Sequence, residues 1–241
     1  MVSCRVPRLV GAALLAAALA PVWAAAEAPP PTLPAAIPPA ERTQLLDLVR
    51  SASVSASARS EPFVARADVF EFLLDHPEFA THVTRALRLA RYRIWHDPEG
   101  LWLDDGWGAV GRFRVVHAAN GSRVMYARGQ YEPKLLPSIH GQAVVVLEYG
   151  TQPAANGRAL ITTHVAGFLK LDSRLLELAG RLAGPLARAK AEKEAERLVR
   201  VFVRVSRAIE DDAAGVHARV REREGVPQRD LEEFRRLLDL R

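Results

Sequence analysis

The spacing of apolar residues changes twice along this 241-residue chain, and these changes limit the possible folds more than any other feature. From Tyr92 to Leu169 apolar side chains recur at every second position, as in strands that present one face to a core. Before and after that segment they recur every three or four residues, as in amphipathic helices. The sequence therefore predicts an α+β protein whose antiparallel sheet lies between helical segments of the chain.

Turn signals divide the central segment into short strands. Ala119-Asn120-Gly121-Ser122 is typical of a two-residue hairpin, because Asn and Gly tolerate the positive φ angles of a type I′ turn. Pro153 and Asn156 lie in a second predicted turn, between residues 150 and 157. We expect strands near 92–94, 101–103, 111–117, 124–128, 142–149 and 160–169, and one more at 51–61. The sheet would then have about six or seven antiparallel strands.

Helical spacing is found on both sides of the sheet segment. It predicts a short helix at 41–50, a helix at 66–75 and a third that begins at Pro77, since proline fits the first turn of a helix. After the sheet, a long amphipathic helix is predicted by Ala191, Ala195, Leu198, Phe202, Val205 and Ile209. Gly184-Pro185 is expected to kink or interrupt the helical segment before it. Residues 213–241 are expected to be a helical extension.

The N-terminus has the pattern of a secretory signal peptide. Arg5 and Arg8 precede an apolar run from Leu9 to Ala20, and small residues follow up to Ala24. The run is about 12 residues long, whereas a membrane span needs about 20, so no stable transmembrane anchor is expected. Residues 1–24 are therefore predicted to be removed on export, and residues 25–40, rich in proline and alanine, to form an extended tether. We expect a periplasmic or secreted bacterial protein.

Composition excludes several classes of function. The one cysteine, Cys4, lies within the predicted signal, so the mature chain has no disulfide, no thiolate catalysis and no cysteine-ligated metal. The 33 basic and 28 acidic residues give a net charge of +5. Two basic residues are lost with the signal, and the remaining +3 is too small to indicate nucleic-acid binding.

No arrangement of residues indicates catalysis, a metal or a cofactor. The seven histidines lack the spacing of metal ligands, and Ser138 near His140 has no nucleophile-elbow motif around it. The letters G-x-G-x-x-G occur at 106–111 but lie between strands with no helix after them, so we regard the match as accidental. Asp104-Asp105 and Asp211-Asp212 are expected at turns or helix ends, because adjacent carboxylates point in different directions.

Aromatic residues concentrate on the predicted sheet and its loops. Core packing explains any one of them, but together they could line an apolar cavity of the kind that holds small ligands. The candidate cavity-lining residues are Trp95, Trp102, Trp107, Phe113, Tyr126, Tyr149, His164, Phe168 and Phe202.

One segment resembles a motif found in the START-like superfamily, also called SRPBCC, helix-grip or Bet v 1-like. It is Phe63-Val64-Ala65-Arg66-Ala67-Asp68-Val69-Phe70-Glu71-Phe72-Leu73-Leu74-Asp75-His76-Pro77-Glu78-Phe79. With the predicted element order, the resemblance covers residues 51–212. It implies a curved antiparallel sheet wrapped around a long C-terminal helix, two short helices after the first strand, and a cavity for hydrophobic ligands such as lipids, sterols, polyketides or aromatic compounds. Gly184-Pro185 and residues 213–241 depart from the family pattern.

Three functions follow as hypotheses. The first is an exported START-like protein that binds or carries a lipid or other apolar small molecule. The second is an enzyme of the cyclase or aromatase type on the same fold, with His164, His140, Tyr126 and Arg128 as first suspects. The third is an envelope interaction module without a ligand. The missing catalytic arrangement favours binding over catalysis, and the sequence does not determine an oligomeric state.

Overall fold

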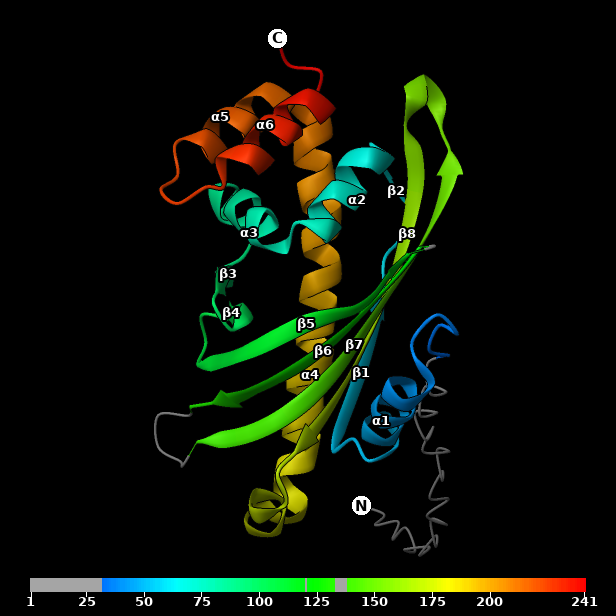
Figure 1. Ribbon diagram of the computed structural model, residues 1–241, viewed down its shortest axis with the longest axis vertical. Coiled ribbons are helices and arrows are strands. Elements are labelled where there is room, and N and C mark those ends of the chain that lie inside the picture. Colours follow the sequence, from blue (N-terminus) through cyan, green and yellow to red (C-terminus); the bar gives the residue numbers. More distant parts are fainter. Residues whose placement is uncertain (1–31, 120, 133–137) are drawn as a thin grey trace, which may run out of the picture.

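The computed structural model describes residues 32–119, 121–132 and 138–241, with backbone only for residues 173–187 and 190 (Figure 1). The predicted signal peptide and most of the tether lie outside these residues. The helices are α1 (Pro39–Arg50), α2 (Ala67–Asp75), α3 (Pro77–Ala86), α4 (Ser173–Asp211), α5 (Ala213–Arg221) and α6 (Gln228–Leu237), with a 3₁₀ turn at Ala155–Gly157. The strands are β1 (Val54–Arg59), β2 (Phe63–Ala65), β3 (Arg93–Asp97), β4 (Gly100–Asp104), β5 (Ala109–Ala119), β6 (Ser122–Tyr131), β7 (Ile139–Pro153) and β8 (Ala159–Leu171).

The strands form one antiparallel sheet in the order β1-β8-β7-β6-β5-β4-β3, and β2 also pairs with β8. The short strand β2 makes eight strands where the sequence predicted six or seven. Ala119 pairs with Ser122 and Gly121 has φ +72°, which confirms the two-residue hairpin. With two short helices after the first strands and a long helix after the last, this is the expected helix-grip fold.

A row of glycines brings the middle strands of the sheet close together. Gly111, Gly129 and Gly141 are register partners on β5, β6 and β7. A Cβ on Gly129 would lie 2.5 Å from the carbonyl oxygen of Val110 and 2.6 Å from the Cα of Gly111. No other residue fits at this approach, so these glycines allow the sheet to curve here.

The long helix α4 differs from the prediction at its first half. Gly184-Pro185 was expected to interrupt the helix, but α4 continues through both residues from Ser173 to Asp211. Proline removes only one backbone hydrogen bond from a helix, and the many other bonds of a 39-residue helix remain. The residue before α4 is Asp172, and its side chain makes no capping hydrogen bond.

The C-terminal residues are part of the main core. The largest cluster of buried side chains joins α2, α3, the end of α4, α5 and α6, and these helices lie together at one end of the molecule (Figure 1). Its members are Val69, Phe72, Phe79, Val83, Val201, Val205, Ile209, Val216, Val220, Val226, Leu231, Phe234 and Leu238. Residues 213–241 are therefore integral to the domain, whereas the sequence suggested an extension beyond it.

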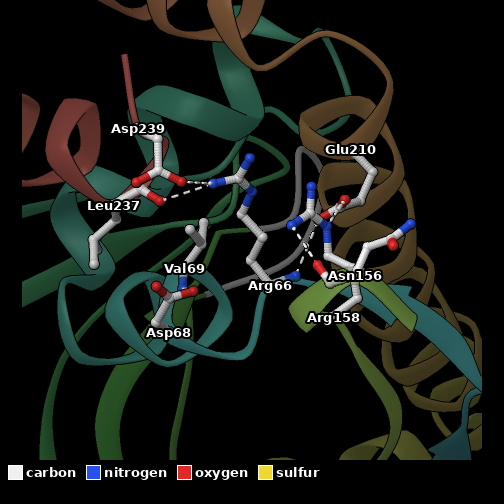
Figure 2. Close-up of polar contacts among 8 residues, drawn as sticks. All are labelled: Arg66, Asp68, Val69, Asn156, Arg158, Glu210, Leu237 and Asp239. Carbon is white, nitrogen blue, oxygen red and sulfur yellow. Dashed lines mark hydrogen bonds and ion pairs between the residues drawn. The ribbon is translucent and has the colours of Figure 1, made fainter. Parts of the chain in front are cut away.

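Polar contacts hold the same helices in place (Figure 2). The Arg66 backbone N–H donates to Glu210 Oε1 at 3.0 Å, and Arg158, just before β8, pairs with Oε2 of the same carboxylate. The Arg66 guanidinium donates to the Leu237 carbonyl at 3.2 Å and to Asp239 Oδ2 at 2.9 Å. The start of α2 is thereby connected to the ends of α4 and α6.

The helix α1 covers the side of the sheet that faces away from α4 (Figure 1). Leu45, Leu48 and Val49 of α1 pack there with Leu33 and Ile37, which are buried although the sequence placed them in a tether. Their partners on the sheet are Val124, Val144, Val146, Ala166 and Phe168. Among the described helices, none is long and apolar enough to cross a membrane.

Candidate ligand-binding site

The face of the sheet toward α4 is called the inner face here, and the face toward α1 the outer face. Leu147 and Val165 pack against Val199 of α4, which identifies the inner face. Register partners in an antiparallel sheet point to the same side, and alternate residues along a strand share that side. Val145 lies two positions from Leu147 on β7 and therefore shares the inner face. Its register partner on β6, Met125, lies on the same face.

The inner face of the middle strands is an apolar floor. One row across the sheet consists of Val115, Met125, Val145, Gly167 and Ala56, and the next of Leu101, Phe113, Ala127, Ala143, Leu169 and Val54. Four of these eleven residues are glycine or alanine, which leaves those positions of the floor low. We define the floor as these two rows.

The cover over the floor is uneven. The helix α4 packs across β1, β2 and β8, and Val199 and Phe202 contact the floor side of β7 and β8. On β5, Val115 is 40% exposed; β4 pairs only with Val110 to Phe113, so β5 is paired with β6 alone at this position. Met125 and Val145 are only half-buried. The part of the floor furthest from β1 is therefore apolar and accessible.

An aromatic cluster closes the floor at its end near α2. Phe70 makes edge contacts with Tyr149 at 5.3 Å, Phe202 at 6.0 Å and Phe63 at 6.0 Å between ring centroids. Burial raises the pKa of the Tyr149 hydroxyl, and the nearby Arg123 guanidinium opposes this effect. The phenol is therefore neutral at physiological pH and can serve as a hydrogen-bond donor.

Arg123 is the charged group at this end of the inner face. Its side chain is 7% exposed and donates from Nε to Asp75 Oδ1 at 2.9 Å. The guanidinium also lies 5.7 Å from the Tyr149 ring centroid. Arg123 and Tyr149 thus form a polar end to an otherwise apolar surface.

At the far edge of the sheet, Trp107 connects the β4–β5 turn to α4. The guanidinium carbons of Arg91 and Arg197 lie 5.1 Å and 5.4 Å from its ring centroid. The turn is fixed by Asp105 Oδ1, which accepts from the backbone N–H groups of Trp107 and Ala109. Asp105 has the turn role expected from the sequence. The contact of the Trp107 ring with Arg197 joins the β4–β5 turn to α4.

The nine aromatic and histidine residues predicted to line one cavity are divided between the two faces of the sheet. Phe113 and Tyr149 lie on the inner face, with Phe202 opposite them on α4. The register places Trp95, Trp102, Tyr126, His164 and Phe168 on the outer face, and Trp107 in the turn. Phe168 is buried beneath α1, and Trp95 stacks on Trp102 with ring centroids 6.3 Å apart.

The floor residues Val115, Met125, Val145 and Leu101 were not among the predicted site residues. Counting outward from the hairpin at 119–122 pairs Val116 with Met125, whereas a β-bulge between Val115 and His117 makes Val115 the partner of Met125. A bulge adds one residue to a strand, so the side chains beyond it point to the opposite face from the one that simple alternation predicts. The sequence carries no clear signal for it.

A hollow of about 420 Å³ lies on the outer face, between α1 and the sheet. Arg114 pairs with Glu41 of α1 and lies 5.4 Å from the Tyr126 ring centroid. The Tyr126 hydroxyl donates to Gln142 Oε1 at 2.7 Å. These polar groups already bind one another, so the hollow offers few free partners to a ligand.

The four residues suspected of catalysis do not converge. Register partners place Tyr126, Arg128, His140 and His164 on the outer face, spread over β6, β7 and β8. The nearest partner of the His164 ring is Glu148, at 3.4 Å from Nδ1. Of the four, only Tyr126 lines the outer hollow. Within the described residues, no group of three His, Cys, Asp or Glu side chains could hold a metal ion.

Comparisons with known proteins give only distant likenesses to solved structures. No protein-family model matches the chain, and no curated protein matches it. Similar solved structures include a hypothetical protein from Helicobacter pylori, with 12% identity, 64% of this chain and 86% of that chain covered, and a TM-score of 0.37. Norcoclaurine synthase from Thalictrum flavum has 15% identity and a TM-score of 0.32. The match covers 66% of this chain and 90% of that chain.

A di-domain ARO/CYC protein of the steffimycin biosynthetic pathway is also similar. It has 16% identity to this chain, covers 73% of it with 56% of its own length, and has a TM-score of 0.33. Likeness of this degree carries no inference about function. The helix-grip assignment therefore follows from the chain's own strand order and helix positions, and the site must be argued from its own residues.

Proposed function

We propose that this protein is exported and binds an apolar small molecule or lipid between the inner face of the sheet and α4. The observation that carries the proposal is the 40% exposure of Val115, which the register places on the inner face beside the half-buried Met125 and Val145. Exposed apolar area of this kind is costly in water, at about 25 cal/mol per Å². An apolar ligand on the floor would remove that area from water.

The ends of the floor suggest the polarity of the ligand. Tyr149 and Arg123 supply a hydroxyl and a cation at one end, while the floor between them and Trp107 is apolar. Ligand sites of this kind combine a mainly apolar wall with a few polar groups that fix orientation. A long apolar molecule with one polar end matches this arrangement.

The test is mass spectrometry of the full chain purified from the envelope fraction of a bacterial host. Native spectra should show the chain carrying one small molecule, which organic extraction releases. The same spectra give the mass of the chain, and removal of residues 1–24 is the expected result of export. A chain of full length in the cytoplasm would contradict export alone.

Two variants on one strand provide a matched comparison. Val115→Glu places a charge on the inner face, and Val110→Glu places the same charge on the outer face, where Val110 is 36% exposed. The Val115 variant should lose the bound molecule, and the Val110 variant should keep it. Equal occupancy in the two variants, or no molecule in the unmodified chain, would contradict ligand binding on the floor.

A further inference from the structure

A second hollow, of about 690 Å³, lies between α3, β3 and the turn that joins α5 to α6. It is separate from the floor and is lined by charged groups. Arg85 comes from α3, Arg93 from β3 and Arg223 from the turn, with His82, Ile94 and Trp95 between them. Three segments far apart in the sequence thus bring three guanidinium groups to one cavity.

These three arginines have no carboxylate partners. Among the described residues, no ion pair within 4.0 Å involves Arg85, Arg93 or Arg223. Burial lowers the pKa of Arg85, and the positive charges of Arg223 and Arg93 lower it further. Arg85 is therefore close enough to Arg223 and Arg93 to be repelled by both, and an anion between them would relieve that repulsion.

Three carboxylates also line the hollow, Glu78, Glu222 and Glu224, but none forms an ion pair with these arginines among the described residues. Glu78 Oε2 lies 2.8 Å from His96 Nδ1, and its charge opposes the lowering of the His82 pKa. Glu222 and Glu224 are exposed at the rim. Within the part of the chain that the structure describes, the three guanidinium groups therefore have no direct carboxylate partner.

Unused polar atoms point to a missing ligand. Arg223 Nε and His82 Nδ1 are buried and have no hydrogen-bond partner in the described part of the chain. Buried polar atoms are nearly always bonded, so each unbonded one requires an explanation. Burial and Arg223 lower the pKa of His82, which keeps this imidazole neutral near pH 7. Arg93 is held in place over the Trp95 ring, with its guanidinium carbon 4.6 Å from the centroid.

We propose that this hollow binds the phosphate group of a small molecule. Guanidinium groups form paired hydrogen bonds to phosphate oxygens, and three cations suit a dianion better than a singly charged carboxylate. The volume exceeds what a phosphate ion alone requires, which leaves room for an organic group beside Trp95 and Ile94. The site does not depend on the apolar floor, and either proposal can fail without the other.

The test measures phosphate binding to the full chain by calorimetric titration and thermal unfolding, at constant ionic strength set with chloride. Inorganic phosphate and phenyl phosphate are the two probes. Both should raise the unfolding temperature of the unmodified chain, and tighter binding of phenyl phosphate would identify an organic phosphate as the ligand. Equal affinity for the two probes would identify free phosphate instead.

The variants are Arg85→Gln with Arg223→Gln, and Arg207→Gln as the control, an exposed arginine of α4 away from the hollow. The double variant should bind phosphate at least tenfold more weakly, and the control should match the unmodified chain. Without phosphate, the double variant should unfold at the same temperature or higher, because the repulsion is removed. Unchanged affinity in the double variant, or an equal response of the unmodified chain to phosphate and chloride, would overturn the proposal.

Discussion

Single residues in the helical end of the molecule couple its stability to pH. His217 is 9% exposed, its Nε2 atom has no partner among the described residues, and its ring stacks near Phe234 at 6.5 Å. Burial lowers its pKa from the usual 6.5, and Arg221 lowers it further, while Glu232 opposes this. Protonation of this ring would place a charge among apolar side chains, and it therefore favours unfolding.

The sign of the pH effect follows from the proton balance. Below about pH 6.5 the unfolded chain binds a proton at His217 that the folded chain does not, so the free energy of unfolding falls as the pH falls. Above that pH both states are neutral and the contribution is constant. We expect urea unfolding between pH 7.5 and 5 to show this loss, and His217→Gln to reduce it. The pH dependence that the variant keeps is expected to come from His82, whose pKa is also lowered. A pH dependence in the variant as steep as in the unmodified chain would contradict this role of His217.

At the scale of elements, the strands show why the faces of the sheet could not be assigned from the sequence. Val144 and Val146 face α1 while Val145 and Leu147 face α4, so this part of β7 is buried on both sides and its alternation disappears. Strand positions, the hairpin and the helices were predictable from local spacing. The face toward α4 was not, because it depends on which helix covers which side.

The elements predicted as an extension contribute strongly to the core. Phe234 of α6 is fully buried, with its ring centroid 5.3 Å from Phe79 and 6.4 Å from Phe72. Helical spacing alone predicted its buried position, but the partners come from α2 and α3, more than 150 residues earlier. A terminal helix of this kind cannot be assigned to a domain without the tertiary contacts.

Replacing Phe234 tests whether residues 213–241 belong to the domain. Phe234→Ala should lower the free energy of unfolding by about 3–5 kcal/mol, because a large buried ring is lost and a cavity remains. Glu232→Ala, on the exposed side of the same helix, should change it by about 0.5 kcal/mol or less. Urea unfolding of the full chain gives both values. A loss near the control value would show that the terminal helices are an independent unit.

At the scale of the whole molecule, the two faces of the sheet are covered differently. The chain before α1 and α1 itself cover the outer face over β7 and β8 with Leu33, Ile37 and Leu45. On the inner face, α4 packs across β1, β2 and β8, while Val115 on β5 remains accessible. Composition and spacing predicted a sheet around a helix. Only the three-dimensional arrangement reveals that the accessible apolar residues of the inner face, Val115, Met125 and Val145, are aliphatic rather than aromatic.

The most direct measurement is an equilibrium titration of the full chain with the neutral fluorescent probe N-phenyl-1-naphthylamine. The unmodified chain and Val110→Glu should bind one probe per chain with a saturable rise in fluorescence. Val115→Glu should bind it at least tenfold more weakly, a difference of about 1.4 kcal/mol, while it keeps its unfolding temperature. No saturable rise in the unmodified chain, or equal binding by the two folded variants, would contradict an apolar ligand site on the inner face.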